Sequence, residues 1–168
     1  MALLNLLRRL RRSSDGAALV EFTIAAPLLL LLMCGVVEMA NAMRQYHVME
    51  KGVRDAARYL AASSANPPCV GVADPPGYSW SQAKTEAKHL ALYGVTSGGA
   101  AFFKGWTDDN TVTVNDGTCL TNPRGASANP LARVTVTATA TYSQLGMLSL
   151  IGLASPTLTV SHQELKVF

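Results

Sequence analysis

The sequence predicts an α+β protein in which a long N-terminal helix, membrane-spanning and then amphipathic, carries a small antiparallel β-sheet head. Three observations lead to this class. An apolar run near the N-terminus is long enough for a membrane helix, its helical period continues beyond the apolar part, and the second half of the chain alternates with the period of β-strands. The 168 residues suffice for one domain with an appendage. Helix and strand do not alternate in the way that builds a parallel sheet.

The net charge is concentrated at the N-terminus. Residues 1–16 carry four arginines and one aspartate, which accounts for the whole formal net charge of +3. The rest of the chain is balanced and has no basic stripe interleaved with aromatic residues, so we expect no nucleic-acid partner. Because 49% of the residues are hydrophobic and 15% are charged, disorder of the whole chain is also excluded.

The apolar run predicts a membrane span. The 21 residues from Ala17 to Val37 contain one charged residue, Glu21. A helix of that length covers roughly 31 Å, close to the thickness of the hydrocarbon core of a bilayer. The arginines before it place the N-terminus in the cytoplasm by the positive-inside rule. We expect a cytoplasmic leader at 1–16, a transmembrane helix at 17–43 and the following chain on the other side of the membrane.

The same helix is expected to continue as an amphipathic segment over 44–62. Its apolar stripe recurs at intervals of three, four or seven: Met39, Met43, Tyr46, Val53, Ala57 and Leu60. Consecutive prolines at 67 and 68 indicate that the helix ends at about Ala62. Residues 63–168 then form the α+β head.

The head is expected to contain a second helix and three strands. The helix extends from about Trp80 to Tyr93, because Ser79 and Gln82 have the spacing of a capping box and Gly94 suits a left-handed C-terminal position. The strands are expected at 111–115, 133–142 and 157–167, with valine and alanine on one face of the second strand and threonine on the other. In the last strand the apolar phase changes near Gln163, which predicts a β-bulge.

A short motif lies between the basic leader and the apolar run. Gly16 ends the leader, and Glu21 follows it by five positions. A secretory signal peptide is cut after its apolar core, whereas this leader ends in front of it. The arrangement resembles a type IV prepilin. That resemblance implies cleavage between Gly16 and Ala17 by a prepilin peptidase on the cytoplasmic face.

Glu21 needs a partner or a shallow position, because a carboxylate inside a bilayer costs roughly 2.5–3.5 kcal/mol. Cleavage supplies a partner, since the new α-amino group of Ala17 lies one helical turn away. The resemblance implies that the amine of a neighbouring subunit pairs with Glu21 and sets the register between subunits. Alternatively, Glu21 snorkels to water or pairs with Arg12.

Further motifs narrow the resemblance. They are Gly16–Phe22, Pro27–Leu32, Gly35–Glu38 and Val53–Tyr59. In this order they resemble the TadE-like family, the pseudopilins or minor pilins of the bacterial tight-adherence pilus system, over roughly residues 13–62. Ala57 stands where family members often have glycine. The resemblance implies a pilin-like fold, a single-pass location in the bacterial inner membrane, and a periplasmic head. The implied partners are membrane lipid, other pilin or pseudopilin subunits and inner-membrane pilus assembly proteins.

The predicted assembly residues are Glu21, Phe22 and Pro27. Pro27 removes a helical hydrogen bond and is expected to kink the helix. The kink either helps subunits to pack or is compensated by neighbouring helices. Glu38, near the outer membrane surface, is either a solvated residue or a contact to a partner subunit.

A charge cluster lies further along the helix. It consists of Arg54, Asp55 and Arg58 and forms either a solvated face or a contact to a partner. Arg54 and Arg58 are four residues apart and repel mildly unless acidic groups lie between them.

The cysteines differ in their surroundings. Cys69 and Cys119 lie in the expected exported head, where an oxidising periplasm favours a disulfide. A bridge that closes about fifty residues stabilises by roughly 4 kcal/mol. The alternative is two buried free thiols. Cys34, in the apolar run, is expected to be a small apolar filler.

No catalytic or metal-binding pattern emerges from the sequence. His47, His89 and His162 lack the spacing of metal ligands, so we expect no metal or cofactor. The Asp/Asn clusters at 108–110 and 115–117 fit turns better than a calcium loop. Because no nucleophile, base and orienting group can be assembled, we expect a protein that is not an enzyme.

The expected function is that of a pseudopilin-like subunit for assembly of a tight-adherence pilus, cleaved after Gly16 and assembled through its N-terminal helix. One alternative is a secreted soluble binding module, because Ala40-Asn41-Ala42 fits a signal-peptidase site with a cut after Ala42. Another is an uncleaved bitopic adhesin or sensor.

Overall fold

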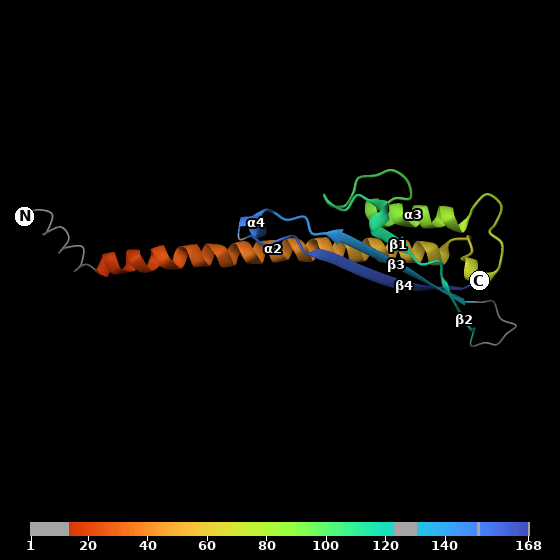
Figure 1. Ribbon diagram of the computed structural model, residues 1–168, viewed down its shortest axis with the longest axis horizontal. Helices are drawn as coiled ribbons and strands as arrows, with labels where there is room; N and C mark the ends of the chain where they lie inside the picture. Colours follow the sequence, from red (N-terminus) through yellow and green to blue (C-terminus); the bar gives the residue numbers. More distant parts are fainter. Residues whose placement is uncertain (1–13, 123–130, 151, 168) are drawn as a thin grey trace, which may run out of the picture.

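The computed structural model describes residues 14–122, 131–150 and 152–167, so the arginines of the leader, Arg12 included, lie outside the described residues. The elements are α2 (Ser14–Ala62), η1 (Pro68–Val70), α3 (Trp80–Tyr93), η2 (Asp109–Thr111), β1 (Val112–Val114), β2 (Thr118–Leu120), β3 (Leu131–Thr141), α4 (Met147–Leu150) and β4 (Thr157–Val167). The predicted class is confirmed: a long N-terminal helix carries a four-stranded antiparallel sheet. Figure 1 shows α2 projecting from the head, with α3 and the sheet along its C-terminal half.

α2 is continuous over 49 residues and ends at Ala62, where the prolines were expected to end it. Among the described residues it is the one helix that is long and apolar enough to cross a membrane. Its N-terminal part carries no packed head, whereas Met49, Val53 and Leu60 in its C-terminal part are fully buried. The N-terminal half of the helix is therefore exposed, and its C-terminal half contributes to the core of the head.

α3 lies against the C-terminal half of α2 because the facing residues are small. A Cβ atom at Gly52 would collide with the carbonyl oxygen of Ala91 on α3. Ala87 and Ala83, one and two turns before Ala91, are also fully buried. The predicted ends of α3 are confirmed, because Ser79 and Gln82 form both bonds of a capping box and Gly94 has a φ of 74°.

β3 is the central strand of the sheet. β4 pairs with its whole length on one edge, and β1 and β2 pair with successive parts of its other edge. As predicted, the side chains of Val134, Val136, Ala138 and Ala140 are buried. The short strand β2 was not expected from the sequence, because three residues are too few to show a period.

The predicted bulge near Gln163 is wrong. Every residue of β4 is described, and the pairing continues without interruption from Leu131–Val167 to Thr141–Thr157. The alternation of apolar residues breaks after Val160, although the strand stays regular. The inward-facing residues beyond Val160 are polar, and they contact polar groups of α2. Glu164 lies 3.6 Å from the Arg58 guanidinium, and Lys166 contacts the C-terminal carbonyl groups of α2.

Candidate assembly surface

The predicted processing site lies in the first turn of α2. The helix begins at Ser14, so Gly16 and Ala17 are both helical. Ala17, Glu21 and Phe22 are exposed. Residues four apart are neighbours on one helix face, so Glu21 lies one turn from the backbone nitrogen of Ala17. The structure thus places the predicted cleavage point and the carboxylate together on one exposed face.

Pro27 lies inside α2 without ending it. Because proline has no N–H group, the carbonyl oxygen of Thr23 lacks its usual helical donor. The Thr23 hydroxyl in turn donates to the carbonyl of Leu19 at 2.6 Å. Pro27 therefore weakens the hydrogen-bond ladder locally while the helix continues.

Exposed apolar side chains surround the N-terminal half of α2, and we call them the apolar belt. The belt consists of Leu19, Val20, Phe22, Ile24, Leu28, Leu29, Leu30, Leu31, Leu32, Met33, Val36 and Val37. A helix that is apolar on all sides is stable only when lipid or protein covers it. None of the described residues, 14–122, 131–150 and 152–167, covers the belt, which is typical of a helix that lipid or another protein covers.

The buried stripe of α2 next to the belt differs from the predicted stripe. Met39, Met43 and Tyr46 were expected to pack, but all three are exposed, with Met39 at 58%. The head instead covers Glu38 and Gln45, on the adjacent face. The reason is that Tyr142, Ser143 and the backbone of Leu145, which follow β3, pair with polar groups on this face of α2. Met39, Met43 and Tyr46, which we call the methionine stripe, extend the apolar belt beyond its end.

A polar helix–head junction joins α2 to the end of β3. It consists of Glu38, Asn41 and Gln45 on α2 and Tyr142, Ser143 and Leu145 after β3. Gln45 donates to the carbonyl of Ser143 at 2.8 Å and accepts from its N–H at 3.0 Å. The Asn41 amide donates to the Tyr142 hydroxyl at 2.9 Å, and burial raises the pKa of that hydroxyl.

Glu38 occupies a position in this junction that sequence reasoning did not anticipate. Its side chain is 3% exposed, so it is not a solvated helix residue. One carboxylate oxygen accepts from the N–H of Leu145 at 3.1 Å, and the other is buried without a hydrogen-bond partner among the described residues. The spacing of Glu38, Asn41 and Gln45 by three and four was a signal of a shared polar face.

The predicted charge cluster has acidic partners within the chain. Arg54 lies 2.7 Å from Glu50, and Arg58 lies 3.6 Å from Glu164 on β4. A hydrogen bond from His162 lowers the pKa of Glu164, and the charges of His162 and Arg58 lower it further. These acids relieve the repulsion between the two arginines, and Asp55 between them is partly exposed.

A second polar cluster, which sequence reasoning missed, joins α2 to α3. The hydroxyl groups of Tyr59 and Tyr78 both donate to one oxygen of Glu86, the Tyr78 bond at 2.6 Å. These bonds lower the pKa of Glu86, while burial and the carboxylate raise the pKa of both tyrosines.

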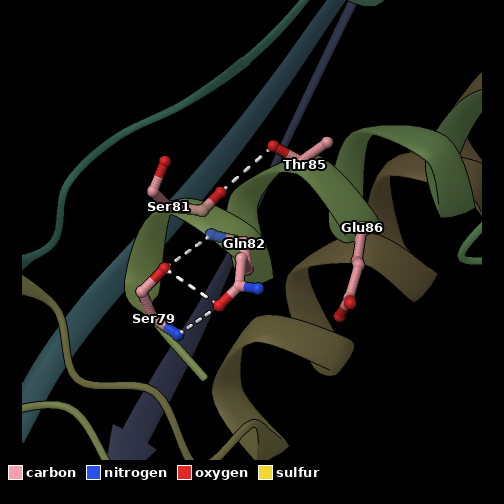
Figure 2. A pocket seen from close by; sticks show the side chains of 5 residues that line it. All are labelled: Ser79, Ser81, Gln82, Thr85 and Glu86. Atoms are coloured by element: carbon pink, nitrogen blue, oxygen red, sulfur yellow. Dashed lines mark hydrogen bonds between the residues drawn. The ribbon is translucent and has the colours of Figure 1, made fainter. Parts of the chain in front are cut away.

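Glu86 also borders a shallow depression at the start of α3, together with Ser79, Ser81, Gln82 and Thr85 (Figure 2). Most of these polar groups are already used by the capping box, by the Thr85 bond to the Ser81 carbonyl and by the tyrosines. The depression is therefore part of the helix cap, and we assign it no ligand.

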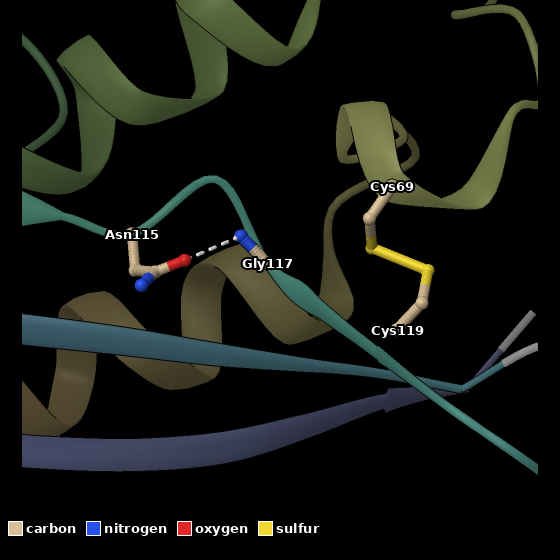
Figure 3. Close-up of a disulfide and its surroundings, with 4 residues drawn as sticks. All are labelled: Cys69, Asn115, Gly117 and Cys119. Carbon is tan, nitrogen blue, oxygen red and sulfur yellow. Dashed lines mark hydrogen bonds between the residues drawn. A yellow bond between two sulfur atoms is a disulfide. The ribbon is translucent and has the colours of Figure 1, made fainter.

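Cys69 and Cys119 form a disulfide between η1 and β2 (Figure 3), with a Cα–Cα distance of 5.6 Å. The turn before β2 requires Gly117, which has a φ of 88° and whose Cβ position would lie 2.9 Å from the Cβ of Pro67. Asn115 accepts from the N–H of Gly117 at 3.0 Å, which confirms the predicted turn.

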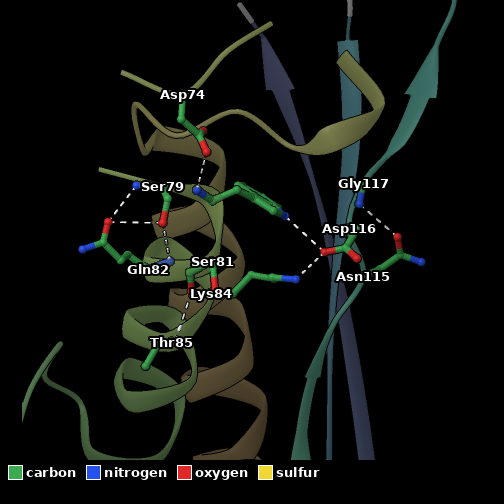
Figure 4. Close-up of polar contacts among 10 residues, drawn as sticks. Asp74, Ser79, Ser81, Gln82, Lys84, Thr85, Asn115, Asp116 and Gly117 are labelled. Atoms are coloured by element: carbon green, nitrogen blue, oxygen red, sulfur yellow. Dashed lines mark hydrogen bonds and ion pairs between the residues drawn. The ribbon is translucent and has the colours of Figure 1, made fainter. Parts of the chain in front are cut away.

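Asp116 in the same turn fixes it to α3 (Figure 4). Its carboxylate accepts from Lys84 and, at 3.3 Å, from the indole N–H of Trp80. The bond from Lys84 lowers the pKa of Asp116. Trp80 and Lys84 therefore join the turn before β2 to the first turns of α3.

The family model of TadE-like proteins matches residues 16–58. This segment of α2 contains the predicted processing site, the apolar belt, the methionine stripe and the charge cluster. The resemblance expected from the sequence is therefore confirmed for α2, and the match ends before the head. Comparisons with curated proteins and with solved structures found no significant match.

Proposed function

We propose that this chain is a pseudopilin-like, single-pass membrane subunit of a tight-adherence pilus system that assembles through α2. The TadE-like match suggests a protein associated with such a pilus. The observation that carries the proposal is the apolar belt, which lies within the matched segment and is exposed on every side. Such a surface suits a helix that first lies in lipid and then packs against other helices.

In this proposal a prepilin peptidase cuts between Gly16 and Ala17 on the cytoplasmic side. The cut removes the arginines and with them the whole net charge of +3. It also creates an α-amino group one turn from Glu21. An amine from a neighbouring subunit neutralises the Glu21 carboxylate and fixes the register of adjacent helices, because an unpaired carboxylate in the apolar belt is costly.

The methionine stripe extends the contact surface between subunits beyond the membrane. Met39, Met43 and Tyr46 are exposed on a face of α2 that the head does not cover. Methionine side chains adapt to irregular apolar surfaces, which suits a helix that exchanges lipid for protein neighbours. Glu38, in contrast, is buried and accepts a hydrogen bond from the head, so we do not include it among the contacts to partners.

The test is the mature N-terminus of the protein, recovered from membranes of cells that contain a prepilin peptidase. We expect a chain that begins at Ala17 and, for Gly16→Trp, at least a tenfold accumulation of the uncut form. Gly35→Ala is the matched control, because a Cβ atom there meets nothing within 4 Å and processing should be unchanged. A wild-type chain that begins after Ala42 contradicts the proposal in favour of a secreted protein. An uncut wild-type chain contradicts it in favour of a bitopic one.

A further inference from the structure

The loop between β3 and β4 is unusually apolar for an exposed segment. No Asp, Glu, Lys or Arg occurs in residues 134–163. Within the loop, Leu145 and Leu153 are 55% and 54% exposed, and α4 carries further apolar side chains. Isolated exposed leucines are common, but this group lies in one short loop that has no charged residue of its own.

This loop lies at the end of the apolar belt. The N–H of Leu145 donates to Glu38, the residue that directly follows Val37 at the end of the belt. Figure 1 shows α4 alongside α2, further toward the N-terminus of α2 than the ends of β3 and β4. The loop therefore extends from the head back along the belt, beyond the polar junction.

Several backbone groups of the loop have hydrogen-bond partners inside the loop. The N–H groups of Gly152 and Leu153 donate to the carbonyl groups of Ser149 and Leu148 at 3.1 and 3.0 Å. The Ser149 hydroxyl donates to the Gly146 carbonyl at 2.6 Å. Irregular backbone is excluded from the hydrocarbon core, because each unpaired polar group there costs several kcal/mol, so the place for such a loop is the interface above it. These bonds lower the cost of placing the loop in a bilayer.

We propose that the β3–β4 loop inserts Leu145, Leu153 and the Met147 and Leu148 side chains of α4 into the outer face of the bilayer beside α2, so that the head contacts the membrane at a second point. This inference rests on the proposed membrane span of α2. If the span ends at Val37, the loop reaches the boundary between head groups and acyl chains, where amphipathic elements bury about 5–10 Å. Lipid is the occupant because the loop is continuous with the apolar belt and carries no charge that a protein partner would complement.

The test measures the depth of single labelled positions in the full chain, reconstituted in vesicles of phosphatidylcholine and phosphatidylglycerol. Cys34→Ser provides the background, with the Cys69–Cys119 disulfide kept oxidised. A fluorophore is attached to Leu153→Cys, Val36→Cys or Val167→Cys, and nitroxide-labelled lipids quench it. Val167 is the matched control because it is 67% exposed and follows Lys166, which contacts the carbonyl of Leu60. That carbonyl lies about 33 Å along α2 from Glu38.

We expect quenching at Leu153→Cys and Val36→Cys at least threefold stronger than at Val167→Cys, at high lipid-to-protein ratio. Quenching at Val36→Cys with none at Leu153→Cys overturns the insertion of the loop and leaves the span intact. Absence of quenching at Val36→Cys overturns the proposed span itself. Cross-linking of Leu153→Cys between two copies without lipid quenching overturns the inference in favour of a contact between subunits. The oxidised disulfide on a non-reducing gel verifies that each variant is folded.

Discussion

Lys166 shows how one residue of the last strand completes the first helix. The last carbonyl groups of an α-helix have no partner within the helix, and the last turn of α2, fully within the described residues, has no basic side chain of its own. The Lys166 ammonium donates to the carbonyl groups of Leu60, at 3.2 Å, and of Ser63. Its side chain is buried, and burial lowers its pKa. Lys166 therefore acts as a C-terminal cap that is distant in sequence.

We expect Lys166→Met to lower the free energy of unfolding by about 1–3 kcal/mol, because it leaves buried carbonyl groups without a donor. Chemical unfolding of the full chain in detergent, followed by circular dichroism, measures this loss. Lys104→Met is the matched control, since Lys104 is exposed, and it should change the value by less than about 0.5 kcal/mol. An equal effect of the two substitutions would show that Lys166 is not a cap.

At the scale of elements, the packing of α3 on α2 depends on the absence of a side chain at Gly52. The backbone of α3 at Ala91 occupies the space that a Cβ atom would need. The tyrosine–glutamate cluster near the start of α3 then fixes the other end of the helix pair. The contact between Gly52 and Ala91 determines how closely the helices approach. The bonds of Tyr59 and Tyr78 to Glu86 determine how the helices align.

Gly52→Ala should separate the two helices and destabilise the head by about 1–3 kcal/mol, although alanine is the better helix former. Thermal unfolding of the full chain in detergent is the measurement. Gly35→Ala, in the same helix but with open space around it, should be neutral or slightly stabilising. If both substitutions stabilise the protein to the same extent, helix propensity outweighs packing and the close approach does not govern this interface.

For the whole molecule, several carboxylates tie separate segments of the head together. Hydrogen bonds lower the pKa of Asp74, Glu86, Asp116 and Glu164, through donors on the backbone, tyrosine, lysine and histidine respectively. A carboxylate with a lowered pKa in the folded state stabilises the protein at pH above its unfolded pKa, near 4. This contribution is lost as the pH falls through the folded pKa.

The melting temperature of the full chain should therefore be constant near neutral pH and fall between about pH 5 and pH 2. Differential scanning calorimetry over that range is the measurement. Asp116→Asn should lower the melting temperature at pH 7 and reduce the size of the fall, because the amide does not titrate. Asp108→Asn, an exposed control, should retain the wild-type profile. A flat wild-type profile would exclude these carboxylates as determinants of stability.

The local features of this protein follow from the sequence by itself. The length of the apolar run, the prolines after Ala62, the capping box at Ser79 and the alternation in β3 each depend on residues close together in the chain. Backbone geometry then specifies helix, strand and turn without knowledge of the rest of the fold. The motifs around Gly16 and Glu21 are local in the same sense, so the resemblance to TadE-like proteins was recognisable.

Only the tertiary structure decided which face of each element is covered. Glu38 and Gln45 are buried because a loop about a hundred residues later supplies their partners. Lys166 and Glu164 face inward without a bulge because the end of α2 offers carbonyl groups and Arg58. A polar residue is stable inside a protein when a partner satisfies it, and that partner is identified by the fold and not by neighbouring residues. For this reason the periodicity of α2 predicted the helix and misplaced its buried stripe at Met39 and Met43.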